Sequence, residues 1–304
     1  MSNLQINFCG LELQNPIITA SGTFSAAGSG KFYDFSKLGA ITTKGVSIDP
    51  WLGNPTPRIA ETRSGMLNAV GLENPGAERF ISDELPLIKG GIASSGTKII
   101  VNVAGRDIDQ YIRAATLINA ADVDMLELNI SCPNIKEGGI SFGTSVQMAS
   151  KVTEAVRQHV TKPLIVKLTP NVTDICEIAL AVEASGADAI SMINTFSGMR
   201  IDIKNRRHIL ANKIGGLSGP AILPLAIRMV YQVAAVVKIP ILGMGGIMTG
   251  EDAVEFLMAG ASAVAVGTAA LVDPSAPLRI LAELKNFMEE NDYKNIEAVR
   301  NALK

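Results

Sequence analysis

Eight short apolar runs recur along this chain of 304 residues, and most are separated from the next by an amphipathic stretch of helical length. The runs are Pro16–Ser21, Ala40–Lys44, Ile99–Val103, Met125–Asn129, Leu164–Leu168, Ala189–Asn194, Pro240–Gly243 and Ala263–Val266. The helical stretches include Ile108–Ala121, Ser145–His159, Thr173–Ser185, Ala221–Val237 and Glu251–Ala259. Strands that are apolar throughout are buried on both faces, and strands that alternate with helices pair in parallel. Eight such units predict an α/β fold, a (β/α)₈ TIM barrel, with an open, doubly wound sheet as the alternative.

Three stretches exceed this minimal plan. Residues 1–15 are expected to form a small hairpin that turns at Gly10 and closes the floor of the barrel. Residues 45–98 and 195–217 are long insertions after the second and sixth strands, and the latter contains a two-stranded excursion around Lys204–Arg207. Long loops at the carboxyl ends of strands usually carry function. With 47% hydrophobic residues the chain can bury one large core, so we predict a single domain over residues 1–304.

Charge and cysteine content exclude several classes of protein. A formal net charge of −2 offers no general attraction to nucleic acid or to an anionic membrane, and no signal peptide or membrane span is visible. The three cysteines, Cys9, Cys132 and Cys176, lack the spacing of a zinc site and are odd in number, which favours a reducing cytoplasm. Cys9 and Cys176 are interpreted as small hydrophobic residues.

In a closed barrel the residues that finish the strands meet at one mouth. These residues are Ser21, Lys44, Asn102, Asn129, Lys167, Asn194, Gly245, Gly246, Gly267 and Thr268. A lysine at a strand end is ordinarily a solvated terminus, but two lysines among three asparagines favour a binding site. The glycines after strands seven and eight are ordinarily tight turns, yet this is where such barrels commonly bind phosphate through backbone N–H groups. We therefore predict a phosphate-binding site at this end of the barrel.

Cys132 lies three residues beyond the fourth strand, in a polar loop that Pro133 stiffens and that Gly138-Gly139 follows as a hinge. Most unpaired cysteines are small buried hydrophobic residues. At the mouth of the barrel, however, an ordinary thiol pKa of about 8.5 leaves enough thiolate for a tuned site to use as a base.

Other chemistries find little support in the sequence. His159 ends a helix and His208 belongs to the second insertion, so neither suits a metal site or a Cys-His hydrolase. No Gly-x-Gly-x-x-Gly follows the first strand. A phosphate site, two lysines and a cysteine base favour a barrel that binds flavin mononucleotide (FMN).

At this point the chain resembles a known family, the class 1 dihydroorotate dehydrogenases, over nearly its whole length. The resemblance rests on motifs that are weak singly but specific in this order and spacing. They are Ala20-Ser21-Gly22, Thr43-Lys44-Gly45, Asn68-Ala69-Val70-Gly71-Leu72, Val101-Asn102-Val103-Ala104-Gly105, the segment Asn129 to Asn134, Val166-Lys167-Leu168, Ile193-Asn194-Thr195, Gly219-Pro220, Gly243 to Gly246 and Val266-Gly267-Thr268.

The resemblance implies an FMN site and a substrate site. The FMN site would comprise Ser21, Lys44, Gly45, Asn102, Asn129, Lys167, Ile193, Gly219, Gly245, Gly246, Gly267 and Thr268. Dihydroorotate would be held by Lys44, Asn68, Ala69, Val70, Gly71, Leu72, Asn129, Asn134, Asn194 and Thr195. Amide side chains suit a ring of alternating N–H and C=O groups because they offer donors and acceptors together.

The resemblance also implies roles for the reactive side chains. Cys132 would remove a proton from C5 of dihydroorotate while hydride leaves C6 for FMN. Lys167 would stabilise negative charge on the reduced ring, and Lys44 would touch both flavin and substrate.

Within class 1, the segments 53–58, 136–143 and 198–202 are most similar to subclass B. That subclass pairs with a second polypeptide that carries FAD and a [2Fe-2S] cluster and passes electrons to NAD⁺. We therefore expect a heterotetramer built on a homodimer of this chain, acting in pyrimidine synthesis.

Three alternatives stay open. A subclass A enzyme would reduce fumarate. A dihydropyrimidine dehydrogenase type typically has histidine where this chain has Asn134. A noncatalytic FMN- or phosphate-binding barrel would have no need of Cys132, Lys44 and Lys167.

Overall fold

A closed barrel of eight parallel strands forms the centre of the molecule. The computed structural model describes residues 2–93, 95–131, 133–134 and 140–303, the side chains of 133, 134 and 140 excepted. The barrel strands, in the order in which they pair, are β3 (Ile17–Thr19), β4 (Ala40–Thr42), β7 (Lys98–Val103), β8 (Met125–Asn129), β11 (Leu164–Lys167), β12 (Ala189–Met192), β17 (Ile241–Met244) and β18 (Ala263–Val266). All eight predicted strands are confirmed, and closure excludes the open sheet.

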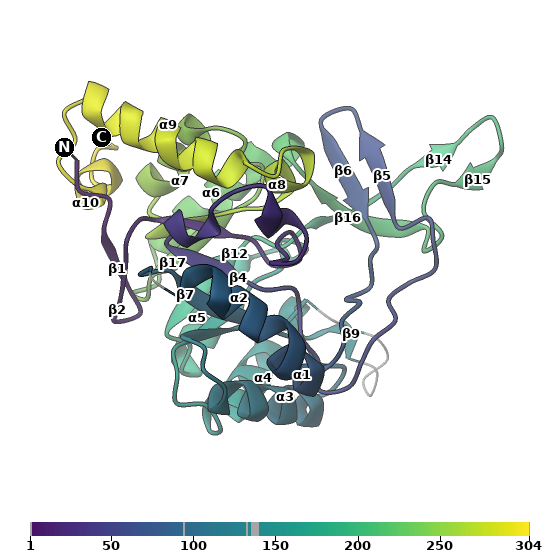
Figure 1. The fold of residues 1–304 in the computed structure, drawn as a ribbon. Coiled ribbons are helices and arrows are strands. Elements are labelled where there is room, and N and C mark those ends of the chain that lie inside the picture. Colours follow the sequence, from purple (N-terminus) through teal and green to yellow (C-terminus); the bar gives the residue numbers. More distant parts are fainter. Residues whose placement is uncertain (1, 94, 132, 135–139, 304) are drawn as a thin grey trace.

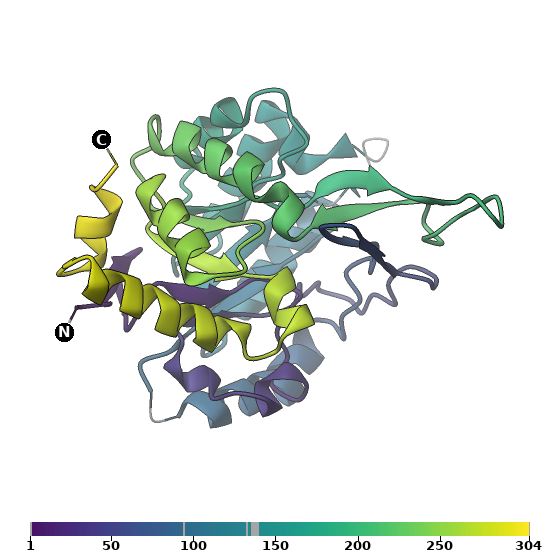
Figure 2. The same ribbon diagram turned by 90° about the horizontal axis from the view of Figure 1, so that it is seen from above.

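Helices surround the barrel, as Figures 1 and 2 show. They are α1 (Ala77–Arg79), which a π turn at Phe80–Glu84 joins to α2 (Leu85–Ile92), then α3 (Ile108–Ala120), α4 (Val146–Arg157), α5 (Ile175–Ala184), α6 (Leu223–Ala234), α7 (Gly250–Met258), α8 (Thr268–Val272), α9 (Ala276–Glu290) and α10 (Ile296–Arg300). Local sequence explains several boundaries. Thr249 and Asp252 form a capping box at the start of α7. Gly186 and Gly260, with φ of +94° and +109°, turn the chain after α5 and α7.

The side chains inside the barrel lie in layers, each contributed by alternate strands. The strand registers place Ile18, Ile100, Ile165 and Leu242 in one layer, and all four are fully buried. Toward the carboxyl ends of the strands the composition changes to polar residues. The interior of the barrel is therefore apolar toward the amino ends of the strands and polar at the carboxyl-terminal mouth.

The N-terminal hairpin consists of β1 (Ile6–Phe8) and β2 (Leu11–Leu13), and Cys9 and Gly10 form its turn with positive φ. Phe8 and Leu13 are fully buried in the same cluster as the barrel interior. The expected floor is therefore confirmed. Both chain ends lie on the same side of the molecule in Figures 1 and 2, and the Asn3 N–H donates to the Lys294 carbonyl at 2.8 Å.

The two long insertions meet in one sheet, which the sequence did not predict. Strands β5 (Ile59–Thr62) and β6 (Gly65–Asn68) come from the first insertion, and β13 (Phe196–Met199) and β16 (Ile214–Ser218) come from the second. They pair in the order β13-β16-β6-β5. The predicted excursion is confirmed as β14 (Ile201–Asp202) paired with β15 (Arg207–His208), which projects from the molecule in Figure 2.

The first insertion is not uniform. Its second half forms the helical segment α1 to α2, which occupies the ordinary helix position between β4 and β7. The glycine pair Gly90-Gly91 and Pro86 weaken the helical pattern in the sequence. Burial of Phe80, Leu85 and Ile88 in the main core stabilises the helix nevertheless.

Candidate active site

The strand ends bring the predicted rim residues to one end of the barrel. Asn129 and Lys167 are the last residues of β8 and β11, and Asn102 is the penultimate residue of β7. Ser21, Lys44 and Asn194 lie two residues beyond β3, β4 and β12, and the glycines 245, 246 and 267 directly follow β17 and β18. Parallel strands share one carboxyl-terminal edge, so all these residues face the same mouth.

Lys167 is the centre of a buried polar cluster. Its Nζ donates to Ser21 Oγ at 3.0 Å and lies 3.9 Å from Glu127 Oε1. The same Glu127 oxygen accepts from Asn102 Nδ2 at 2.6 Å. Asn102 and Glu127 are fully buried and Lys167 is 4% exposed. Three strands and the segment just after β3 thus bring an amide, an ion pair and a hydroxyl into contact.

The amides of Asn129 and Asn194 form a second cluster. Asn194 Nδ2 donates to Asn129 Oδ1 at 3.4 Å, and the Thr195 N–H donates to Asn194 Oδ1 at 2.8 Å. The Tyr111 hydroxyl donates to the Asn129 carbonyl at 2.5 Å and fixes the end of β8. The two amide side chains therefore orient each other, and the hydroxyl of Tyr111 fixes the backbone from which Asn129 projects.

The sheet of the two insertions adds Asn68 to this second cluster. Asn68 pairs with Gly216 on β16, and its Nδ2 donates to the Gly216 carbonyl at 3.5 Å. A Cβ placed on Gly216 would lie 2.0 Å from Thr195 Oγ1. Gly216 therefore lies against both Asn68 and Thr195.

The segment Val70-Gly71-Leu72 reaches the first cluster. A Cβ on Gly45 would lie 3.0 Å from Asn102 Oδ1 and 3.3 Å from Leu72 Cδ2. The Asn54 N–H donates to the Val70 carbonyl at 3.0 Å, and Asn54 Nδ2 donates to the Ala69 carbonyl at 3.0 Å. Gly71 has a φ of +77°, so a side chain there would be strained. The segment is thus tied down beside the barrel mouth.

The residues that follow β17 and β18, which include Gly245, Gly246 and Gly267, are also closely packed. A Cβ on Gly245 would lie 3.3 Å from Ile193 Cγ1, and one on Gly267 would lie 3.4 Å from Ala20 Cβ. Gly246, with a φ of +89°, leaves no space for a side chain against Leu223. At Gly246 the backbone therefore approaches its neighbours more closely than a side chain would permit, and at Gly245 a Cβ would lie 2.9 Å from Ala226 Cβ.

Gly219 and Thr268 connect the residues after β17 and β18 to the four-stranded sheet formed by the two insertions. Thr268 Oγ1 donates to Ser218 Oγ at 2.8 Å, and Gly219 has a φ of +96° with its Cα next to Gly65. The predicted FMN residues therefore form one continuous rim in the described part of the chain.

Lys44 faces a cavity of about 400 Å³ between the insertion and the barrel. Gly45, Trp51, Glu73 and Glu84 also line it. Burial raises the pKa of the Glu84 carboxyl, and the positive charge of Lys44 opposes this effect. The lysine therefore lies in a partly enclosed, mixed-charge setting rather than at a solvated strand end.

Some predicted residues are not placed. Cys132 and the hinge Gly138-Gly139 lie outside the described residues. Asn134 belongs to β9 (Pro133–Asn134), which pairs with β10 (Ile140–Ser141), and its side chain also lies outside the description. The predicted roles of Cys132 and Asn134 stay predictions.

Three polar residues of the site were not anticipated from the sequence. They are Glu127, Tyr111 and Ser218. A signal for Glu127 existed, because it alternates with Asn129 in Leu-Glu-Leu-Asn and so shares its face of the strand. Tyr111 and Ser218 carried no such signal, since helix packing and sheet pairing bring them to the site.

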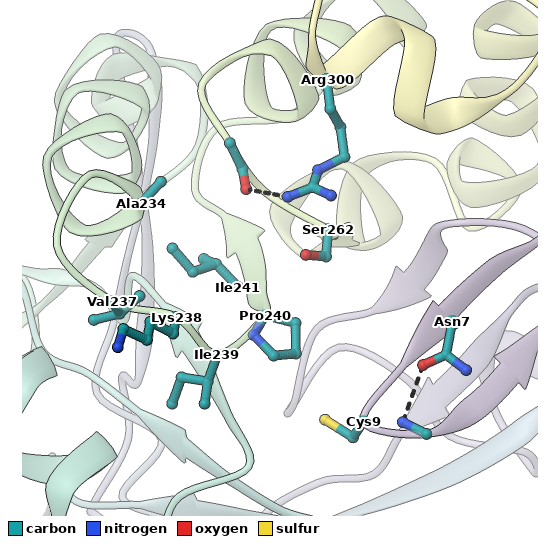
Figure 3. A pocket seen from close by; sticks show the side chains of 12 residues that line it. Asn7, Cys9, Ala234, Val237, Lys238, Ile239, Pro240, Ile241, Ser262 and Arg300 are labelled. Atoms are coloured by element: carbon teal, nitrogen blue, oxygen red, sulfur yellow. Dashed lines mark hydrogen bonds between the residues drawn. The ribbon is translucent and has the colours of Figure 1, made fainter.

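A second cavity, of about 380 Å³, lies at the opposite end of the barrel (Figure 3). Its lining includes Cys9, Lys238, Ser262 and Arg300, and Arg300 donates to the Gly260 carbonyl at 3.2 Å. It contains none of the predicted site residues. The predicted site residues that the structure describes thus lie at the other end of the barrel, at the carboxyl-terminal mouth.

The described residues contain no group of three or more His, Cys, Asp or Glu side chains that could hold a metal ion. None of their helices is long and apolar enough to cross a membrane.

Comparisons with known proteins point in one direction. A chain of 55% identity over 302 residues, covering 99% of both sequences, is the dihydroorotate dehydrogenase B (NAD⁺) catalytic subunit of Alkaliphilus metalliredigens. Proteins of the same description from Alkaliphilus oremlandii and Listeria monocytogenes are 54% and 51% identical and cover 98% and 99% of this chain, and 97% and 98% of their own length. The family model for dihydroorotate dehydrogenase matches residues 3–288, so this chain belongs to the dihydroorotate dehydrogenase family.

Proposed function

We propose that this chain is the FMN-binding catalytic subunit of a dihydroorotate dehydrogenase B. It oxidises dihydroorotate to orotate in pyrimidine synthesis and passes the electrons, through a partner subunit, to NAD⁺. The observation that carries the proposal is the continuous polar rim around Lys167, which unites residues from every part of the chain. The description shared by the full-length relatives supports the same activity.

The residues present suit FMN. Asn102 Oδ1 is buried and has no hydrogen-bond partner among the described residues, so it is available as an acceptor for a ring N–H. Lys167 supplies a buried positive charge. The glycines after β17 and β18 expose backbone N–H groups where barrels of this type commonly bind phosphate. When bound, FMN supplies a two-electron acceptor for hydride.

Residues of this chain perform the other parts of the reaction. Cys132 removes the proton from C5 of dihydroorotate. Asn68, Asn129, Asn134, Asn194 and Thr195 hold the ring through paired donors and acceptors. Lys44 neutralises the carboxylate, and the segment from Ala69 to Leu72 closes one side of the substrate. Lys167 provides positive charge where negative charge develops.

The electron acceptor requires a partner. A [2Fe-2S] cluster usually takes four cysteines, whereas this chain has three that are far apart in sequence. We place FAD and the cluster on a second polypeptide, in a heterotetramer built on a homodimer of this chain. A cytoplasmic location and a single catalytic domain over residues 1–304 complete the proposal.

The test is anaerobic bleaching. The purified protein should be yellow, with one FMN per chain, and dihydroorotate should bleach it. Dihydrouracil, which lacks the carboxylate, should bleach it far more slowly if Lys44 recognises that group. A colourless protein that takes up no FMN would contradict the proposal, and rapid bleaching by dihydrouracil would favour the dihydropyrimidine dehydrogenase type.

A further inference from the structure

A polar layer lies inside the barrel directly below the mouth. The strand registers place Thr42, Glu127, Ser191 and Ala265 in this layer, one from each alternate strand. All four residues are almost fully buried. Thr42 Oγ1, Glu127 Oε2 and Ser191 Oγ have no hydrogen-bond partner among the described residues. Glu127 is the charged member of this layer.

Glu127 connects the polar layer to the layer above, which holds Ala20, Asn102, Lys167 and Met244. Its Oε1 accepts from Asn102 Nδ2 at 2.6 Å and lies 3.9 Å from Lys167 Nζ. The side chain of Glu127 is fully buried and that of Lys167 is 6% exposed. The carboxylate therefore neutralises a buried ammonium group and orients an amide that the proposed function places against FMN.

Packing does not explain a carboxylate at this position. The two layers below are filled by isoleucine, leucine, methionine and alanine, which seal the barrel without polar atoms, whereas the layer above contains the polar residues Asn102 and Lys167. Replacing a buried ion pair by apolar residues of similar volume is often neutral or stabilising, whereas removing one partner is strongly destabilising. The pair has a cost in folding that an apolar pair avoids, which indicates a role in the chemistry.

We infer that Glu127 is a positioning residue that sets the reduction potential of the bound flavin through Lys167. The inference rests on the proposed function, because it requires FMN at the mouth. A negative charge below Lys167 offsets part of its positive charge. Reduced flavin carries more negative charge than oxidised flavin, so Glu127 lowers the flavin potential and favours onward transfer of electrons.

The test is the midpoint potential of the FMN in Glu127→Gln. Glutamine keeps the size of the side chain and an oxygen that can accept from Asn102, but it removes the charge. Stepwise anaerobic reduction in the presence of reference dyes measures the potential without using dihydroorotate. We expect the equilibrium to shift about tenfold toward reduced flavin, which is about 30 mV for a two-electron couple.

Ser191→Ala is the matched control. It removes a polar atom from the same layer without changing charge, so the potential should stay at the wild-type value. An unchanged potential in Glu127→Gln, or an equal shift in Ser191→Ala, would overturn the inference, because a purely structural Glu127 predicts one of these results.

A second variant covers the case in which Glu127→Gln does not fold or bind FMN. An uncompensated Lys167 ammonium would cause that loss. The double variant Glu127→Gln with Lys167→Met removes both charges and should restore folding, which circular dichroism and the thermal unfolding midpoint measure without FMN. Failure of the double variant to do so would contradict the pairing.

Failure of the proposed function and failure of the inference about Glu127 give different experimental results. A wild-type protein that binds no FMN contradicts the proposed function, and the inference with it. A wild-type protein that binds FMN and bleaches with dihydroorotate, together with an unshifted Glu127→Gln, contradicts the inference alone.

Discussion

At the scale of single residues, the proton-abstracting base is the sharpest prediction. Cys132→Ala should lower the rate of flavin reduction by dihydroorotate by about 10²-fold to 10⁴-fold, since that is the usual contribution of a positioned base. FMN content should not change. Stopped-flow measurement of flavin bleaching at neutral pH gives the rate. Full activity in Cys132→Ala would remove the cysteine from the mechanism.

Cys132→Ser tests the basicity of the side chain while keeping a polar group at the same position. A hydroxyl is a much poorer base than a thiol, so activity should recover only at high pH. A serine variant with the pH profile of the wild type would show that the proton goes elsewhere.

The thiol of Cys9 makes the free energy of unfolding depend on pH. Burial, helped by the negative charge of Asp188, raises the pKa of Cys9 from 9.0 to about 12. Above pH 9.0 the unfolded chain loses this proton while the folded chain keeps it. The stability that Cys9 confers is therefore complete below pH 9.0 and is lost as the pH rises toward 12.

The comparison of wild type with Cys9→Ser isolates this effect. Urea unfolding should show a difference in free energy between the two proteins that is constant from pH 7 to pH 9 and changes in favour of the serine variant above it. A difference that stays constant up to pH 11 would mean that the Cys9 thiol ionises equally in both states.

At the scale of elements, the joined insertions make a glycine of β16 critical. In Gly216→Ala the new Cβ would displace Thr195, whose Oγ1 lies 2.0 Å from the Cβ position. We expect at least about a tenfold loss in kcat/KM for dihydroorotate, because small displacements of positioning residues are costly. Steady-state assays with FMN-loaded protein measure it.

Gly198→Ala in the same sheet is the control. Its Cβ would meet the flexible end of Leu67 at 3.0 Å, away from Thr195. Activity should be close to that of the wild type. Equal losses in both variants would indicate general damage to the sheet rather than displacement of Thr195.

The individual elements show which parts of the fold the local sequence determines. The eight strands were predictable because each is a continuous apolar run with a glycine or a polar residue at its end, as in Leu-Ile-Val-Lys167. Helix α2 was missed because Pro86, Gly90 and Gly91 disfavour helix locally, and only burial of Leu85 and Ile88 compensates. The pairing of β6 with β16 was missed because register between distant segments has no local signal.

At the scale of the whole molecule, the proposal predicts where electrons go. The isolated chain with FMN and dihydroorotate should reduce neither NAD⁺ nor fumarate rapidly, because the proposal assigns the NAD⁺ site and its electron carriers to a partner. Co-purification from the native source should yield a complex with visible bands of FAD and an iron-sulfur cluster that reduces NAD⁺. Rapid fumarate reduction by the isolated chain would instead indicate a subclass A enzyme.

The sequence by itself determined the barrel and the polar rim at the carboxyl ends of its strands. Closure of eight parallel strands forces residues such as Lys44, Asn102 and Lys167 onto one edge. Their convergence follows from the repeat of strand and helix along the sequence and from their place at the ends of strands. Only the tertiary structure decided their partners. The contacts of Lys167 with Ser21 and Glu127, and of Asn68 with the strand beside Thr195, join segments distant in sequence. The physical reason is that burial and strand register, which set those contacts, depend on the whole packed chain rather than on any segment of it.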